Sequence, residues 1–114
     1  MAAPALERFE RAYPGHVRWI GQDPAGDLEA FAREYGVSSP SVPDLPPYEI
    51  SNGYGIESVP TMVVLDQRGV VADVVESWDR DGYNRASASL ASLLGAASVT
   101  ISEPGDGLPE FRPG

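Results

Sequence analysis

Two apolar runs joined by a short turn constrain the fold of this chain more than any other feature. The first run is "TMVVL" (61–65), the turn is "DQRG" (66–69) and the second run is "VVADVV" (70–75). Apolar runs separated by a short glycine-containing turn are typical of an antiparallel β-hairpin. Pro60 precedes the first run, and since proline cannot donate a hydrogen bond to a sheet, it suits the start of a strand. The sequence therefore predicts a hairpin whose first strand begins at Thr61.

Helical periodicity appears on both sides of this hairpin. Apolar residues recur at helical spacing in segments 4–13, 24–35 and 79–94, and a short helix is expected near 49–54. Asp23 and either Asp79 or Asp81 are expected to cap two of these helices, which Gly36 and Gly95 would end in a left-handed conformation. With a short strand expected at 17–21, the order of elements predicts an α/β fold.

Composition excludes several classes of protein. The chain has 114 residues with an apolar content of 42%, which suits one folded domain. Its net charge, 8 minus 17, is −9, so a phosphate backbone would be repelled and nucleic acid is not an expected partner. The apolar runs are far shorter than a membrane span. Residues 1–13 contain Glu7 and Glu10 and lack the apolar core of a secretory signal peptide.

Residues that commonly carry chemistry are sparse. Cysteine is absent, so these residues offer no thiolate nucleophile, disulfide or cysteine–zinc site. His16 is the only histidine, and without paired ligands it is expected to be a solvated loop residue. The serines of segment 87–92 have no histidine nearby in the sequence, and Gly53 and Gly55 lack the lysine of a phosphate-binding loop. We therefore expect no catalytic residues, no metal site and no cofactor.

The loop and hairpin together carry a family resemblance. The stretch "YGIESVPTMVVLDQRGVV" (54–71) resembles the thioredoxin-like superfamily, most closely its TlpA-like and redoxin (AhpC/TSA-type) branch. The flanking segments "PALERFERAYPGHVRWIG", "DPAGDLEAFAREYGV" and "SWDRDGYNRASASLASLLG" are similar to the helices and strand that surround this motif in the family. The resemblance covers about residues 3–95. It implies an α/β, thioredoxin-like three-layer sandwich.

The resemblance also implies a binding site. In this family the proline before the hairpin strand is cis, and the backbone of the preceding residue pairs with an extended peptide substrate. Carried over to this chain, Val59, Pro60 and Thr61 would form a peptide-binding groove, with an extended peptide or protein as partner. Trp78, which follows the hairpin, is a further candidate for lining that groove, although large aromatic residues more often serve as packing residues.

The chain departs from the family where the family's chemistry is located. The relatives exchange thiols and disulfides through a Cys-x-x-Cys pair at the start of the first helix, preceded by a central strand. Pro4 matches the proline that follows the second cysteine, so the first central strand and the redox motif are both missing. We therefore expect a thioredoxin-like domain at 1–96 that is incomplete at its N-terminus, followed by an extended C-terminal segment at 97–114.

Three arrangements would compensate for the missing strand. Residues 98–102 could fill the gap as a strand, two chains could share strands in a homo-oligomer, or the gene product could be longer and the chain N-terminally truncated. We favour the last, because the flanking elements look undamaged. Without compensation, each buried unpaired backbone group costs about 1–3 kcal/mol. Several such groups together rival the stability of a whole domain, about 5–15 kcal/mol.

Three functions follow from these patterns. The first is a thioredoxin-like domain of the thiol-disulfide oxidoreductase (TlpA/redoxin) family that is redox-inactive because it has no cysteine. The second is a non-catalytic peptide-binding module that uses the groove at Pro60. The third is an assembly element that completes its sheet from another chain. The resemblance implies bacterial relatives that are often secreted or membrane-tethered, whereas the residues themselves carry no compartment signal.

Overall fold

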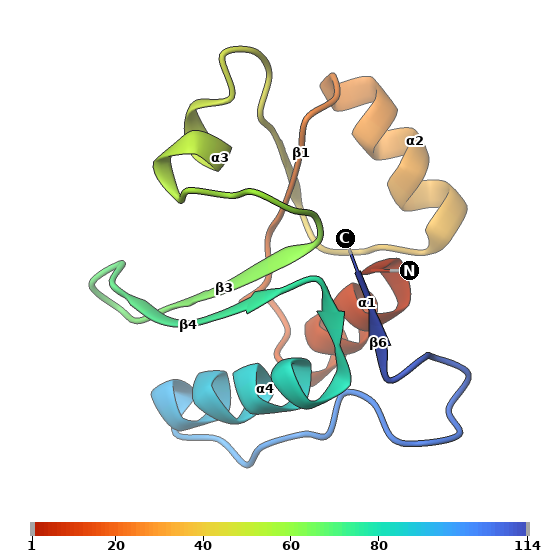
Figure 1. The fold of residues 1–114 in the computed structure, drawn as a ribbon, viewed down its shortest axis with the longest axis vertical. Coiled ribbons are helices and arrows are strands. Elements are labelled where there is room, and N and C mark those ends of the chain that lie inside the picture. Colours follow the sequence, from red (N-terminus) through yellow and green to blue (C-terminus); the bar gives the residue numbers. More distant parts are fainter. Residues whose placement is uncertain (1, 114) are drawn as a thin grey trace. The chain divides into compact units, whose positions relative to one another are not determined.

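The computed structural model describes residues 2–113 and shows a mixed α/β fold built from short elements (Figure 1). The elements, in chain order, are α1 (Ala2–Ala12), β1 (Trp19–Gly21), α2 (Ala25–Tyr35), β2 (Ser41–Pro43), α3 (Glu49–Gly53), β3 (Thr61–Leu65), β4 (Val71–Glu76), β5 (Trp78–Asp79), α4 (Arg80–Leu94) and β6 (Phe111–Arg112). The strands of the described residues form three two-stranded sheets, β1–β2, β3–β4 and β5–β6. The expected mixed α/β class is confirmed at this level.

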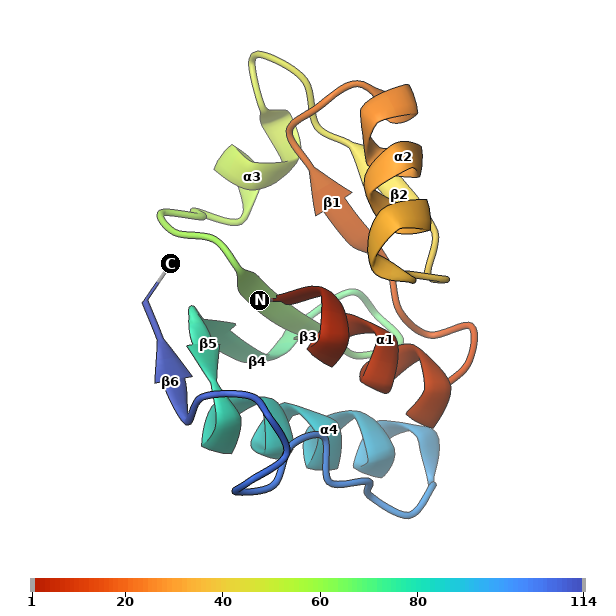
Figure 2. The same ribbon diagram turned by 90° about the vertical axis from the view of Figure 1, so that its right-hand side faces the viewer.

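The contacts divide the chain into two units, residues 2–57 and residues 58–113. In the first unit β1 and β2 pair in parallel, and α2 is the crossover between them (Figure 2). Leu28 is the buried residue of α2 and packs closely against the backbone of Gly21. Phe31 and Tyr35 remain 40% and 55% exposed, so only part of the predicted apolar stripe is buried.

The ends of the helices follow simple local rules. Gly36 and Gly95 end α2 and α4 with φ angles of 68° and 67°, as predicted. Pro24, rather than the expected Asp23, is the N-cap of α2, and its carbonyl accepts a hydrogen bond from the Asp27 N–H at 2.9 Å. The prediction of an Asp23 cap was therefore wrong by one residue. Asp79 is the N-cap of α4 but makes no side-chain capping bond.

The predicted hairpin forms the sheet of the second unit. β3 and β4 are antiparallel, with a register shift between Val64 and Leu65. Asp66 closes the turn locally, because its Oδ1 accepts hydrogen bonds from the N–H groups of Arg68 and Val70 at 2.8 and 3.0 Å. Gly69 has a φ of 78°, which few other residues adopt without strain. Turn and strands thus arise from neighbouring residues.

Helix α4 covers one face of the hairpin (Figure 1). Val64 and Val75 are buried on that face, and a Cβ atom at Gly82 of α4 would overlap the Val75 side chain. After α4, the chain returns along the helix as an irregular segment (Figure 2). Residues 98–102, considered above as a strand, have no strand structure, and only the two residues of β6 pair with β5.

Polar side chains of α4 hold this irregular segment. The side-chain oxygen of Asn84 accepts hydrogen bonds from the N–H groups of Ile101 and Ser102, and its amide donates to the Ser102 carbonyl at 2.9 Å. Arg80 is buried and donates to Ser102 Oγ at 3.0 Å and to the Leu108 carbonyl at 2.8 Å. The segment expected to be extended is therefore tied to the helix by specific hydrogen bonds.

Candidate functional site

The predicted site residues Val59, Pro60 and Thr61 form the approach to β3. The Val59–Pro60 peptide bond is cis, which confirms the expectation for that bond. Val59 is 68% exposed, and Pro60 is half-buried. Thr61 Oγ1 donates a hydrogen bond to the Ser58 carbonyl at 2.6 Å, so this hydroxyl holds the loop in place. The structure thus brings these three residues together at one end of the hairpin.

The register of the hairpin decides which backbone groups face away from β4. The Ser77 N–H donates to the Pro60 carbonyl at 2.8 Å, so Pro60 points its carbonyl toward the second strand. Backbone groups alternate along an antiparallel strand, and Thr61, Val63 and Leu65 therefore direct their N–H and C=O groups to the opposite edge. We call this edge the outer edge of β3. No strand pairs with it among residues 2–113.

The other edge of the hairpin is closed by side chains at Val74. The Val74 N–H of β4 donates to Asp73 Oδ1 at 2.9 Å, and the Val74 carbonyl accepts from the Arg85 guanidinium at 3.3 Å. Arg85 also forms an ion pair with Asp73 at 3.0 Å. The hydrogen bond from Arg85 lowers the pKa of the Asp73 carboxyl group below its ordinary value. Charged side chains that occupy an edge in this way prevent further strand pairing.

The two faces of the hairpin also differ. Paired residues place their side chains on the same face, so Met62, Val64, Asp73 and Val75 share the face that α4 covers. We call the opposite face the outer face. It carries the side chains of Thr61, Val63, Leu65, Val71, Val74 and Glu76. Leu65, Val71 and Val74 are 39%, 46% and 44% exposed, so this face presents an apolar surface.

Trp78, the fourth predicted site residue, lies in the interior of the second unit. Its side chain is fully buried, and the indole N–H donates to the Pro109 carbonyl at 2.6 Å. The ring packs edge-on against Tyr83 with 4.7 Å between centroids, and burial raises the pKa of the Tyr83 hydroxyl to about 12. Trp78 thus presents no exposed surface to a ligand and acts as a packing residue.

Two further residues considered in the sequence, His16 and Ser87, have different surroundings. His16 is exposed in the turn after α1. Ser87 is buried, and its hydroxyl donates to the Val99 carbonyl at 2.5 Å. Among residues 2–113, no group of three or more His, Asp or Glu side chains could hold a metal ion. In the same part of the chain, no helix combines the length and apolar character that crossing a membrane requires.

Sequence reasoning did not identify Asp73, Arg85 or Glu76. A detectable signal was present, because the turn at 66–69 and the apolar runs on either side of it set the register of a hairpin. Given that register, Asp73 could have been assigned to the face that α4 covers and Glu76 to the outer face. The contact between Asp73 and Arg85, however, depends on how α4 packs on the sheet.

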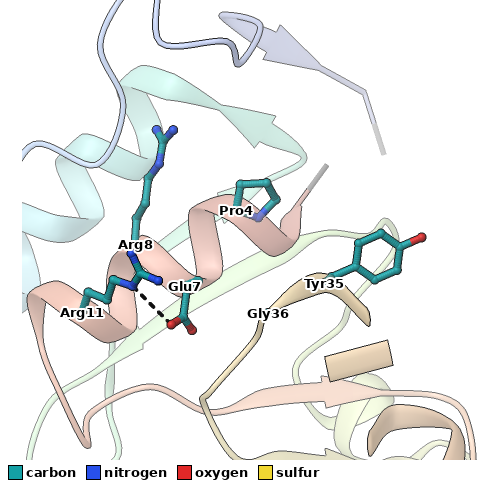
Figure 3. A pocket seen from close by; sticks show the side chains of 6 residues that line it. All are labelled: Pro4, Glu7, Arg8, Arg11, Tyr35 and Gly36. Carbon is teal, nitrogen blue, oxygen red and sulfur yellow. Dashed lines mark hydrogen bonds and ion pairs between the residues drawn. The ribbon is translucent and has the colours of Figure 1, made fainter. Parts of the chain in front are cut away.

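A shallow hollow of about 340 Å³ lies in the first unit between α1 and the end of α2 (Figure 3). Glu7 lines it but is already engaged, because it accepts hydrogen bonds from the Ser38 N–H and hydroxyl at 2.8 Å and pairs with Arg11 at 3.4 Å. The bond from the Ser38 N–H lowers the pKa of Glu7 most. Figure 3 shows Arg8 and Tyr35 pointing away from this carboxylate, so the polar groups do not converge on a ligand.

Comparison with protein-family models, curated proteins and solved structures finds no match for this chain. The candidate site therefore rests on the hairpin itself. Its features are the exposed Val59, the outer edge of β3 and the apolar outer face.

Proposed function

We propose that this chain is a thioredoxin-like binding module that accepts an extended peptide at Val59–Thr61 and along the outer edge of β3. The peptide would add a strand next to β3, so that its backbone pairs with the outward groups of Thr61, Val63 and Leu65. Because no cysteine is present, the bound peptide would meet no thiol chemistry from these residues. The resemblance of residues 54–71 to the thioredoxin-like superfamily supports the same location.

One observation carries the proposal: the backbone groups at the two edges of the hairpin differ in whether they are hydrogen-bonded. Asp73 and Arg85 occupy the backbone groups of Val74 on β4, whereas no strand of the described residues pairs with the outer edge of β3. An edge with free backbone groups is a template for another strand, and proteins usually protect edges that have no partner. The asymmetry supports β3 as the edge at which the peptide would bind.

Two proline substitutions test the proposal on the full chain. Peptide ligands are first selected from random linear peptides of about ten residues, the upper end of usual strand lengths. Val63→Pro removes an outward N–H from β3, and Val74→Pro removes one from the closed edge of β4. The two residues are cross-strand partners on the same face, so the changes are matched in chemistry and position. Circular dichroism and thermal melting establish that both variants fold.

We expect Val63→Pro to weaken binding of a selected peptide about tenfold, since leaving a buried partner unsatisfied costs about 1–3 kcal/mol. Val74→Pro should weaken binding far less, by no more than about twofold, because its N–H already bonds Asp73 and Val74 lies one strand further from the peptide than Val63. In wild-type chain, bound peptide should slow hydrogen exchange at the amides of Thr61, Val63 and Leu65, with Met62 and Val64 as internal references. A library that yields no binder, or peptides that protect none of the outward amides, would contradict the proposal.

A further inference from the structure

We infer that the peptide accepted by the outer edge of β3 is cationic, with alternating apolar side chains and a Lys or Arg opposite Thr61. This inference rests on the proposed function and adds the chemical class of the ligand. Each pair of residues that lie opposite each other on β3 and β4 forms a row of side chains across the outer face, and a strand paired with β3 would lengthen each row. The inference follows from the chemistry of these rows. Peptide residues opposite Thr61, Val63 and Leu65 would place their side chains on the outer face, because directly paired residues share a face.

Two of these rows are apolar. Val63 pairs with Val74, and Leu65 pairs with Val71. Val74 and Val71 are 44% and 46% exposed, so their methyl groups still face solvent. Peptide side chains opposite Val63 and Leu65 would continue these rows, and apolar cross-strand pairs stabilise a sheet. Alternate positions of the peptide should therefore be apolar.

The third row ends in a carboxylate. Thr61 pairs with Glu76, which is exposed and whose side chain makes no hydrogen bond or ion pair within residues 2–113. The Thr61 hydroxyl is already bonded to the Ser58 carbonyl, and threonine is the smallest side chain of the outer face. A peptide residue opposite Thr61 would lie two strand spacings, about 10 Å, from the Glu76 backbone. The long stem of Lys or Arg can extend over Thr61 and bring its charge to Glu76.

Charge also favours a cationic peptide over a second copy of the chain as the occupant of the outer edge of β3. A copy paired antiparallel through its own β3, centred on Val63, would place Leu65 opposite Thr61 and offer no cation to Glu76. It would also bring a second net charge of −9. A cationic peptide instead complements both Glu76 and the acidic chain, so we commit to the peptide as the occupant.

Three synthetic peptides test the inference: acetyl-RTVTVTR-amide, acetyl-ETVTVTE-amide and acetyl-RTSTSTR-amide. Each reads the same in both directions at its outer-face positions, so the result does not depend on strand polarity. Affinities are measured for the full chain, for Glu76→Lys and for Glu103→Lys. Glu103 is an exposed acidic residue on the segment after α4, so its variant makes the same change in net charge away from the site.

We expect the wild-type chain to bind the arginine peptide about two- to fivefold more tightly than the glutamate peptide, the size of an exposed ion pair. The ratio of the affinities for the arginine and glutamate peptides should be at least about twofold lower in Glu76→Lys than in Glu103→Lys. The serine peptide should bind more weakly than its valine counterpart. Equal shifts in the two lysine variants would overturn the inference while leaving peptide binding intact.

Further outcomes separate failure of the inference from failure of the function. If library-selected peptides protect the outward amides but the arginine peptide does not, only the inference fails. If no peptide of either kind protects them, the proposed function fails as well. A concentration-dependent dimer in sedimentation, with the outward amides protected in the absence of peptide, would assign the edge to a second copy and overturn the cationic ligand.

Discussion

Val63 of β3 and Val74 of β4 lie directly opposite each other on the outer face, yet their backbone groups have different surroundings. The Val74 N–H and carbonyl are bonded to Asp73 and Arg85, whereas Val63 directs its N–H and carbonyl to an edge that no strand of residues 2–113 occupies. The two residues thus have the same side chain on the same face, but their backbone groups differ in hydrogen bonding. The difference between the edges, rather than composition, is therefore the basis of the proposed peptide site.

Gly82 of α4 allows the helix to approach the hairpin closely. A Cβ atom at this position would lie 2.6 Å from a Val75 methyl carbon and 2.9 Å from the Asp79 carboxylate. We expect Gly82→Ala to lower the free energy of unfolding by about 1–3 kcal/mol, because overpacking outweighs the gain in helix propensity. Urea denaturation followed by circular dichroism measures the change.

A matched control is Gly26→Ala in α2, where a Cβ atom would meet nothing within 4 Å. This substitution should leave stability unchanged or raise it by up to about 1 kcal/mol through helix propensity. If Gly82→Ala stabilised the protein as Gly26→Ala does, the close approach of α4 to β4 would be incorrect.

Asn84 is predicted to anchor the segment after α4. Its side chain bonds the N–H groups of Ile101 and Ser102 and the Ser102 carbonyl, and both of these residues are buried. Asn84→Ala should lower the free energy of unfolding by about 1–3 kcal/mol, since it leaves buried backbone groups unsatisfied. It should also speed hydrogen exchange at the two amides.

The control for this anchor is Ser92→Ala, which replaces an exposed polar side chain further along the same helix. Surface substitutions of this kind usually change stability by less than about 0.5 kcal/mol. Hydrogen exchange at Ile101 and Ser102 should stay as in the wild-type chain. Equal effects of the two alanine substitutions on these amides would show that Asn84 does not hold the segment.

Asp44 predicts a dependence of stability on pH. Its buried carboxylate accepts hydrogen bonds from the Ser51 hydroxyl at 2.6 Å and from the N–H groups of Ile50 and Ser51. The Ser51 hydroxyl bond is the largest cause of the lowered pKa of Asp44, whose ordinary value is 3.8. A lowered pKa in the folded state means that the stabilisation is complete above this ordinary value and is lost as the pH falls through the folded-state pKa.

We therefore expect Asp44→Asn to lower the melting temperature at neutral pH and to differ less from wild type in acid. Asp23→Asn makes the same change in charge at an exposed position and provides the control. Melting curves from neutral pH down to the acid range measure both variants. A deficit for Asp44→Asn that stays constant over this range would show that the carboxylate charge contributes nothing.

The sequence alone determined the elements that form between neighbouring residues. The hairpin was predictable because Asp66 and Gly69 build its turn locally, between two apolar runs. The ends of α2 and α4 were predictable because Gly36 and Gly95 accept a left-handed conformation without strain. The resemblance additionally led to the expected cis bond at Pro60.

Only the tertiary structure decided which surfaces remain open. The sequence pattern did not predict β2 (Ser41–Pro43), which becomes a strand because β1 supplies its hydrogen bonds from more than twenty residues away. Likewise, the burial of Trp78, the bonds of Asn84 to residues 101 and 102 and the closure of β4 by Arg85 all depend on contacts distant in the sequence. A residue's neighbours along the chain specify its turn or helix, but a hydrogen-bonding group is open or closed only once distant segments have packed.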